Sequence, residues 1–340
     1  MIKNSNRKST TLVIALSIGL LLFIILFSLS FGTVKISFKE TLSILLNKKN
    51  GIKSSHIYII RNLRIPRTIT AILVGMALSL SGAVFQAVFK NPMADPYILG
   101  ISSGAACGVA FGAITSLINI IPGIWGTPLF SFLGAILTSL VIYILSDRLK
   151  SGNLTLLLSG VAINFLLSAL MSLMMYFNRD QLEDIIYWNM GSFAVSSYEK
   201  LIVIGPILIL CTVILLRYHK QLDLMLLGNN QAKSMGLEVR KTTIIVLCIA
   251  TLLTSSAVAL SGIIGFIGLI VPHVVRIIFG PSHKKLLPLS IVFGALFALL
   301  ADTFGRSILP STELPISIIT ALLGAPFFIY LLKKQKRMLF

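Results

Sequence analysis

A series of apolar runs, each close to the length that crosses a lipid bilayer, limits most strongly what this chain can fold into. A helix needs about 20 apolar residues to cross the hydrocarbon core. Runs of this kind occupy residues 11–31, 63–88, 94–118, 128–146, 154–177, 198–217, 241–262, 265–280, 286–304 and 313–332. The 340-residue chain is 56% hydrophobic and only 12% charged, which excludes a water-soluble domain. We therefore predict an all-α, polytopic membrane protein of about ten transmembrane helices.

The run at residues 265–280 is short for a full crossing. It is either tilted against its neighbours or partly re-entrant, in which case the chain would have nine crossings. Gly262, Gly265 and Gly268 come just before Pro272. This pattern predicts a distorted helix or a turn between two short helices.

Glycines at four-residue spacing open the third run, at Gly100, Gly104, Gly108 and Gly112. The spacing places all four on one helical face, which another backbone can approach closely. Such faces drive helix association in lipid, where burial of apolar side chains offers no hydrophobic gain. We expect this face to form a helix–helix contact.

Basic residues are concentrated in the segments on one side of the predicted membrane. If the N-terminus is cytoplasmic, 18 of the 29 lysines and arginines fall in the inner segments. Because short loops rich in Lys and Arg stay in the cytoplasm, we predict a multi-pass membrane protein with both termini cytoplasmic. This excess also accounts for much of the net charge of +18, so no nucleic-acid partner is needed.

The outer segment 32–67 is an exception, because it holds eight cations. A loop this long determines topology less strongly than a short one. Its charge fits a solvated loop or, alternatively, a basic rim that attracts an acidic partner or an anionic substrate.

The cytoplasmic segment 218–240 interrupts the membrane pattern with two short amphipathic pieces, one on each side of Gly228. Asn229 or Asn230 can cap the second piece, which is long enough for about a turn and a half of helix and which Gly236 can end. The segment therefore predicts a short helix presented to the cytosol.

Apolar side chains crowd the end of the first piece, at Leu222, Leu224, Met225, Leu226 and Leu227. Exposure of so many to water is costly, so we expect them to pack on the protein or to be buried against a cytoplasmic partner. A helix that lies on the membrane surface is the alternative.

The sequence contains no cluster of residues that suggests chemistry. Cys107, Cys211 and Cys248 lie far apart in apolar runs, without the spacing of a metal site or a disulfide framework. The four histidines are scattered. We therefore predict no catalytic residues, no metal and no cofactor. Ionisable groups clearly at mid-membrane are also lacking, which argues against a carrier driven by an ion gradient.

Four stretches in order along the chain carry a family resemblance. They are LRIPRTITAILVGMALSLSGAVFQAVFKNPMADPYILGISSGA at 63–105, LGNNQAKSMGLEV at 227–239, GIIGFIGLIVPHVVRIIFGPSHKKLLPLS at 262–290 and ELPISIITALLGAPFFIYLLKK at 313–334. With these stretches the chain resembles the FecCD family, the permeases of ABC importers for iron–siderophore complexes, haem and cobalamin. The first run and residues 32–60 carry least of the resemblance.

The resemblance implies a single transmembrane permease domain over residues 1–340, built as two inverted five-helix halves. Spans one to six would lie within 11–217, a cytoplasmic coupling loop within 218–240, and spans seven to ten within 241–332. The implied partners are a second copy of the chain, two cytoplasmic ABC ATPase subunits, an extracellular or periplasmic substrate-binding protein, and membrane lipid. The implied location is the bacterial cell (inner) membrane.

Two sets of site residues follow from the resemblance. The ATPase-docking loop would carry Gly228, Ala232 and Gly236. In the cobalamin member of the family, outward arginines pair with glutamates of the binding protein, and the matching positions here are Arg64, Arg67 and Arg306. Arg64 and Arg67 could instead anchor their helix at the membrane interface, and Arg306 could form a local ion pair with Asp302 or Glu313.

The function predicted from this resemblance is import of an iron complex, siderophore or haem, by alternating access. ATP hydrolysis would reside in the partner subunits, so the chain itself would not be an enzyme. Cobalamin is the alternative cargo, and an ion-coupled secondary transporter is the alternative mechanism. The residues that line the substrate path are not evident from the sequence.

Overall fold

The computed structural model describes residues 2–48, 51–148, 153–309 and 312–336. Every regular element in these ranges is helical, which confirms the all-α prediction. The first half contains α1 (Ile2–Ser30), α2 (Phe38–Leu45), α3 (Ser54–Tyr58), a π-helical turn η1 (Ile59–Arg64), α4 (Ile65–Val88), η2 (Pro96–Leu99), α5 (Ile101–Ile114), α6 (Leu117–Ile120), η3 (Gly123–Trp125), α7 (Gly126–Arg148) and α8 (Asn153–Phe177). The second half contains η4 (Arg179–Gln181), α9 (Leu182–Asn189), α10 (Tyr198–Arg217), α11 (His219–Leu226), α12 (Asn229–Ser234), α13 (Val239–Ser261), α14 (Ile267–Phe279), α15 (His283–Gly305) and α16 (Ile316–Lys336).

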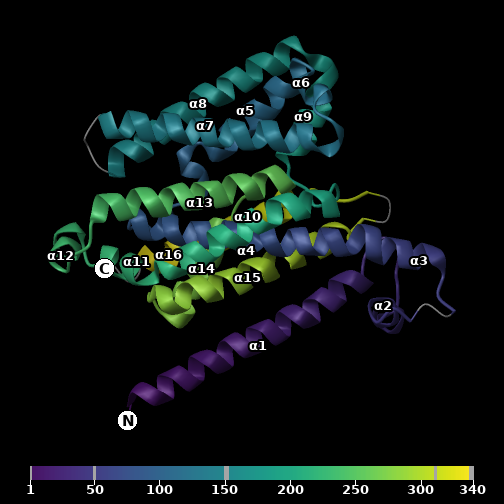
Figure 1. Cartoon of the computed structure of the whole chain (residues 1–340), viewed down its shortest axis with the longest axis horizontal. Coiled ribbons are helices and arrows are strands. Elements are labelled where there is room, and N and C mark those ends of the chain that lie inside the picture. Colours follow the sequence, from purple (N-terminus) through teal and green to yellow (C-terminus); the bar gives the residue numbers. More distant parts are fainter. Residues whose placement is uncertain (1, 49–50, 149–152, 310–311, 337–340) are drawn as a thin grey trace.

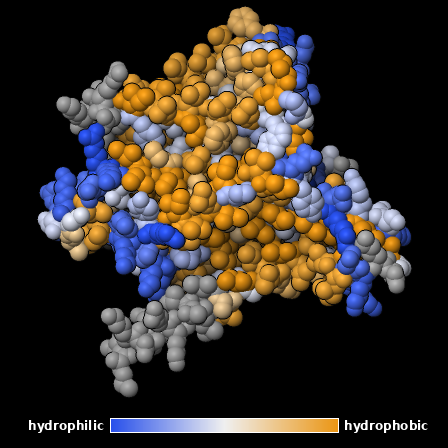
Figure 2. Space-filling model, viewed as in Figure 1, coloured by the Kyte–Doolittle hydropathy of each residue, from blue (hydrophilic) through white to orange (hydrophobic). Residues whose placement is uncertain are grey.

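Ten apolar helices correspond to the ten predicted runs. Six are long and apolar enough to cross a membrane, among the residues that the structure describes. The other four are shorter apolar helices, namely Ala15–Ser30, Ile101–Ile114, Ile267–Phe279 and Ile316–Tyr330. A hydrophobic belt covers the middle of the surface, and hydrophilic residues gather at its two ends (Figure 2). The chain is therefore a multi-span protein embedded in a membrane.

Two of the predicted crossings are shorter than their apolar runs. The run at 94–118 becomes the turn η2 followed by α5, which has 14 residues, and the run at 265–280 becomes α14, which has 13. At 1.5 Å per residue each helix is about 20 Å long, less than the roughly 30 Å hydrocarbon core. The expected broken backbone before Pro272 is confirmed, and the long third span is corrected, because Pro96 and Gly100 divide it.

The irregular connectors that precede these two short helices meet inside the protein. The Tyr97 hydroxyl donates a hydrogen bond to the carbonyl of Ile264 at 3.1 Å and accepts one from the Ile264 amide at 3.2 Å. Asp95 accepts from the Tyr97 amide at 2.8 Å and so caps η2. Backbone groups that leave the helices are thus hydrogen-bonded within the protein, which non-helical backbone at membrane depth requires.

Helix α4 forms the centre of the bundle. It packs against α10, α13, α14 and α15, while α5, α7 and α8 form a second group beyond α13 (Figure 1). A side chain at Gly75 would overlap the Gly294 backbone of α15, and one at Gly82 would overlap the Gly268 backbone of α14. Gly104 and Gly108 of α5 lie equally close to α7, which confirms the predicted contact.

The two halves of the chain run in opposite directions through this bundle. The end of α4 lies beside the start of α12, where Lys90 Nζ donates to Asn229 Oδ1 at 3.0 Å. Helix α13 starts near this end and finishes at the other, where the Ser192 amide donates to the Ser261 carbonyl at 2.7 Å. Helix α1 begins and α16 ends on the same side as α12 (Figure 1).

Replacing Gly75 or Gly294 with Ala should destabilise the bundle, because each new methyl group meets backbone that cannot move aside. We expect a loss of about 1–3 kcal/mol in the free energy of unfolding, typical of overpacking. Denaturant titration of the purified protein in detergent measures it. Gly205→Ala in α10 is the control, since its nearest neighbour would be a Leu73 methyl at 3.7 Å. Equal stability of all three variants would show that the close α4–α15 contact is not required.

Candidate functional site

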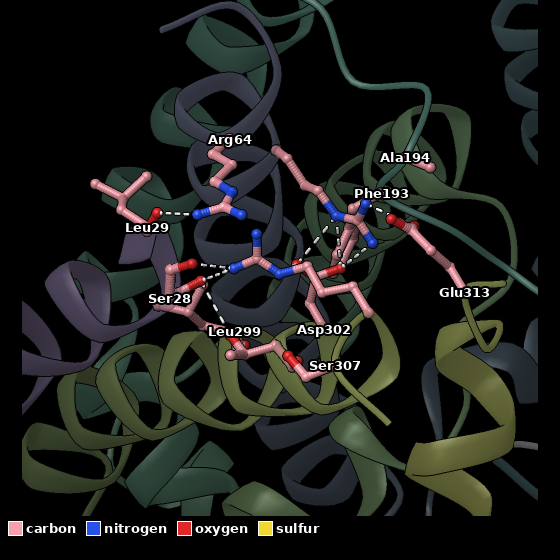
Figure 3. Close-up of polar contacts among 12 residues, drawn as sticks. Ser28, Leu29, Arg64, Phe193, Ala194, Leu299, Asp302, Ser307 and Glu313 are labelled. Carbon is pink, nitrogen blue, oxygen red and sulfur yellow. Dashed lines mark hydrogen bonds and ion pairs between the residues drawn. The ribbon is translucent and has the colours of Figure 1, made fainter. Parts of the chain in front are cut away.

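An ionic cluster, drawn in Figure 3, lies at the end of the bundle opposite α12, which sequence analysis predicts to be the outer end. It is formed by Arg64 and Arg67 where α4 begins, by Asp302 and Arg306 where α15 ends, and by Glu313 just before α16. The cluster therefore unites the three arginines that sequence analysis singled out. We call these five residues the outer charge cluster.

Arg67 is the most fully paired member of the outer charge cluster. Its Nε lies 2.9 and 3.1 Å from the two carboxylate oxygens of Asp302, and a second nitrogen lies 2.9 Å from Asp302. Its Nη1 lies 2.7 Å from Glu313 Oε2. Such forked, charge-assisted contacts hold both partners in a defined geometry. Arg67 thus joins α4 to α15 and to the segment that enters α16.

Arg64 and Arg306 point into the protein and hold the end of α1. Arg64 Nη1 donates to the carbonyl of Leu29 at 2.6 Å, and Arg306 Nη2 donates to the Ser28 hydroxyl at 2.6 Å and to the Ser28 carbonyl. The last carbonyls of a helix lack partners within that helix and carry partial negative charge. The two buried guanidinium groups satisfy them, which explains why cations lie there.

This geometry bears on the expected docking role of the arginines, which stays a prediction. The side chains of Arg64 and Arg306 are about 5% and 3% exposed, so this conformation presents neither to a partner. The local ion pair considered for Arg306 is present with Asp302, at 3.6 Å, whereas Glu313 pairs with Arg67. The exposed cations of the outer segment lie instead around α2 and α3, at Lys35, Lys39, Lys48 and Lys53.

The segment between α10 and α13 contains the expected short helix, α12, but its start differs from the prediction. The helix begins at Asn229, so neither Asn229 nor Asn230 caps it, and Gly228 occupies the capping position with φ of 109°. Gly236 ends the helix with φ of 84°, and its amide donates to the Lys233 carbonyl at 2.9 Å. Asn229 is used instead to bind Lys90.

The side chains of this loop divide between the protein interior and solvent. Ala232 lies on the face of α12 that packs on the protein and is fully buried. A Cβ atom added at Gly228 or Gly236 would have no neighbouring atom within 4 Å, so these two positions border open space. Leu222 and Met225 pack in the main core, so the expected burial of the apolar residues is met for these two. Leu227 and Met235 are 53% and 61% exposed.

An uncovered apolar pair therefore adjoins α12, and we call Leu227 and Met235 the inner apolar patch. Sequence analysis missed Met235, because the register of so short a helix does not show which side chains face outward. Whether Gly228, Ala232 and Gly236 dock an ATPase stays a prediction. Of these three, Ala232 lacks the exposure that a direct contact needs.

A polar cavity lies between α5, α8 and the connector before η2. Its volume is about 570 Å³, and its polar lining comprises Asp95, Tyr97, Ser102, Ser103, Asn164, Ser168 and Asn189. Ser103 Oγ donates to Asn164 Oδ1 at 2.5 Å across it. Sequence analysis left the path-lining residues unidentified. The Ser and Asn residues scattered through the apolar helices were the sequence signal that could have indicated this cavity.

The part of the chain that the structure describes contains no group of three or more His, Cys, Asp or Glu side chains that could hold a metal ion. Its main polar features are the outer charge cluster, the loop around α12 and the polar cavity. Polar groups placed at both ends and inside a bundle of ten apolar helices fit a membrane-embedded transport protein.

The sequence places the chain within this class. The FecCD transport family matches residues 20–334, and the chain belongs to this family. It is 36% identical over 337 residues to the hemin transport system permease protein HmuU of Yersinia pestis, covering 98% of each chain. It is 39% identical over 289 residues to the cobalamin import system permease protein BtuC of Halobacterium salinarum, covering 84% of this chain and 76% of that one.

A solved structure supports the same fold. It is described as an inward-facing conformation of a metal-chelate type ABC transporter, with 34% identity and a TM-score of 0.84. The match covers 95% of this chain and 99% of the other. The predicted family and fold are thereby confirmed.

Arg67→Ala should destabilise the protein strongly, because it leaves Asp302, which is 2% exposed, without its forked partner. We expect a loss of about 3–5 kcal/mol, typical of breaking a buried ion pair. Glu313→Ala is the matched control and should cost about 1 kcal/mol or less, since Glu313 is 38% exposed and its pair is screened by water. Denaturant titrations compare the two. Equal losses would mean that burial of Asp302 does not decide the effect.

Proposed function

We propose that the chain is the membrane-spanning subunit of an ABC importer that moves an iron complex, siderophore or haem, into the cell. Two partner ATPases would supply the energy from the cytoplasmic side, and the chain itself would carry out no hydrolysis. The observation that carries the proposal is the α12 loop with its uncovered apolar patch, in a chain of the FecCD family. A water-exposed apolar pair next to a short helix fits a protein contact.

The α12 side of the bundle is then the cytoplasmic side, and the start of α1 and the end of α16 lie on it (Figure 1). The positive-inside distribution of Lys and Arg supports this orientation. An ATPase seated on Leu227 and Met235 would bear on α12, and nucleotide-dependent movement would alternate which end of the transport path is open.

A second copy of the chain fits against α8. The apolar residues of this helix are mostly uncovered, among them Leu158, Phe165, Leu166 and Leu173. The polar cavity opens beside the same helix, with Asn164 and Ser168 of α8 in its lining. We propose that two copies enclose a path there. Hydroxyl and amide groups in an otherwise apolar wall suit a bulky chelate that must pass without tight binding.

Cobalamin remains the alternative cargo, because a cobalamin permease and a hemin permease are similarly related to this chain. The alternative mechanism is an ion-coupled carrier, for which Asp95 in the polar cavity is the relevant carboxylate. A single experiment separates both alternatives from the proposal.

The experiment is transport by the reconstituted complex. The chain is purified with the ATPase and binding protein encoded beside it and inserted in liposomes, and uptake of ferric siderophore, haem and cobalamin is measured. We expect uptake of an iron complex that requires ATP. Uptake of cobalamin alone would change the cargo, and uptake that follows an imposed ion gradient without ATP would overturn the importer proposal.

Met235→Glu should abolish ATP-dependent uptake by placing a charge in the inner apolar patch. Gly236→Pro should do the same, since its φ of 84° is closed to proline. Met235→Leu is the matched control and should retain transport, because it preserves the apolar surface. Binding of the ATPase to detergent-solubilised permease is the direct readout. Undiminished ATPase binding and uptake by Met235→Glu would remove the patch from the docking surface.

The outer rim gives a separate prediction about the binding protein. Reversing Lys35, Lys39 and Lys53 to Glu should weaken its docking, because these lysines are exposed and their field extends into solvent. The difference in affinity between the variant and the wild type should become smaller as the salt concentration rises. Dissolved ions screen exposed charges beyond roughly 10 Å at 0.1 M. Surface plasmon resonance at two salt concentrations measures it. Unchanged affinity would identify these lysines as a solvated loop and nothing more.

A further inference from the structure

Helix α15 connects the two ends of the bundle. Its first residue, His283, lies at the α12 end, and its last turn carries Asp302 in the outer charge cluster. The helix has 23 residues and is therefore about 34 Å long. It is also in backbone contact with α4 at Gly75 and Gly294, so the two helices are closely packed, and we refer to them as the α4–α15 body. Pro288 lies inside α15 near its inner end, and the Gly294 contact lies beyond it. We expect a displacement of the inner end to be carried along the helix to the outer end.

The inner end of α15 is held by Asp223, a residue of another helix. Asp223 Oδ1 accepts hydrogen bonds from the backbone amide and from the ring Nδ1 of His283, each at 2.7 Å. Ser282, at the N-cap position, makes no side-chain cap of its own. Asp223 thus satisfies the first backbone amide of α15, which has no partner within the helix, and it lies where the helix dipole favours a negative charge.

The contact between Asp223 and His283 is sheltered from water on one side. The His283 side chain is fully buried, and its Nε2 is buried with no hydrogen-bond partner among the described residues. Burial alone would raise the pKa of Asp223, but the hydrogen bonds from His283 outweigh it and lower this pKa below its ordinary value. The carboxylate therefore stays charged at neutral pH.

Asp223 belongs to α11, the helix directly before α12. Leu222 and Met225 on either side of it pack in the main core, and α11 contacts both α4 and α15. Helix α12 itself packs on α11 and α13. A partner that moves α12 therefore reaches the α4–α15 body by two routes. One runs through α11, where Asp223 contacts His283, and the other is the hydrogen bond from Lys90 at the end of α4 to Asn229 of α12.

We propose that Asp223 and His283 are positioning residues that transmit movement of α12 to α15, and through α15 to the Arg67–Asp302 pair at the opposite end. The inference rests on the proposed function of the α12 loop. It accounts for a hydrogen-bonded Asp–His pair placed between α11 and α15, where an ordinary cap from Ser282 would have served α15 alone.

The test compares the number of ATP molecules hydrolysed per cargo imported in the reconstituted complex. Asp223→Ala and His283→Leu should raise this ratio about tenfold or more, because the ATPase still docks and turns over while α15 no longer follows; a tenfold change corresponds to about 1.4 kcal/mol. His283→Asn should stay near the wild-type ratio, because its side-chain amide can donate to Asp223 in place of Nδ1.

Glu238→Ala is the control, since this acid lies beside α12 but is exposed and pairs only at the surface with Lys241. Thermal unfolding of each variant is measured in parallel. If Asp223→Ala lowers the unfolding temperature but leaves the ATP-to-cargo ratio of the folded complex unchanged, the pair is a structural cap and the inference fails. If wild-type protein shows no ATP-driven uptake, the proposed function itself fails.

Discussion

Direct backbone contact between α4 and its neighbours is the interaction on which the rest of the structure depends. In lipid, apolar side chains gain little by leaving the tails for a protein interior, so helices associate where close packing is possible. Gly75 against Gly294 and Gly82 against Gly268 bring α15 and α14 to that distance. Because α14 is then held against α4, the connectors before α5 and α14 meet and satisfy one another through Tyr97 and Ile264. The short helices and the polar cavity beside them follow from this central packing.

At each end of the bundle, charged side chains complete helix termini that belong to other parts of the chain. Arg64 and Arg306 bind the last carbonyls of α1, and Asp223 binds the first amide of α15. The reason is common to both, since helix ends carry unsatisfied groups and partial charge. These contacts place ionic groups where helices must keep their relative positions, at the two surfaces from which partners would act.

Sequence periodicity and composition predicted the ten apolar helices, the broken segment before Pro272 and the glycine-mediated contact of α5, because each depends on residues near one another in the chain. The division of residues 94–118 at Pro96 and Gly100 was missed, since hydropathy alone does not distinguish a continuous span from a re-entrant turn. The family motif located Arg64, Arg67 and Arg306. Their surroundings were missed, because Arg64 and Arg306 are buried against the end of α1 and Arg67 against Asp302, all contacts between residues far apart in the chain. The exposure of Met235, the contact of His283 with Asp223 and the lining of the polar cavity were missed for the same reason, because each depends on tertiary packing.

The contact between Arg306 and Ser28 has a consequence for biosynthesis. These residues are 278 positions apart, so the ribosome has made most of the chain before Arg306, the second of the two cations that hold the end of α1, exists. Arg64 is made much earlier and binds the Leu29 carbonyl. A chain that stops short of α15 would therefore hold the end of its first helix by Arg64 alone, and the face of α1 that packs on α15 would stay uncovered.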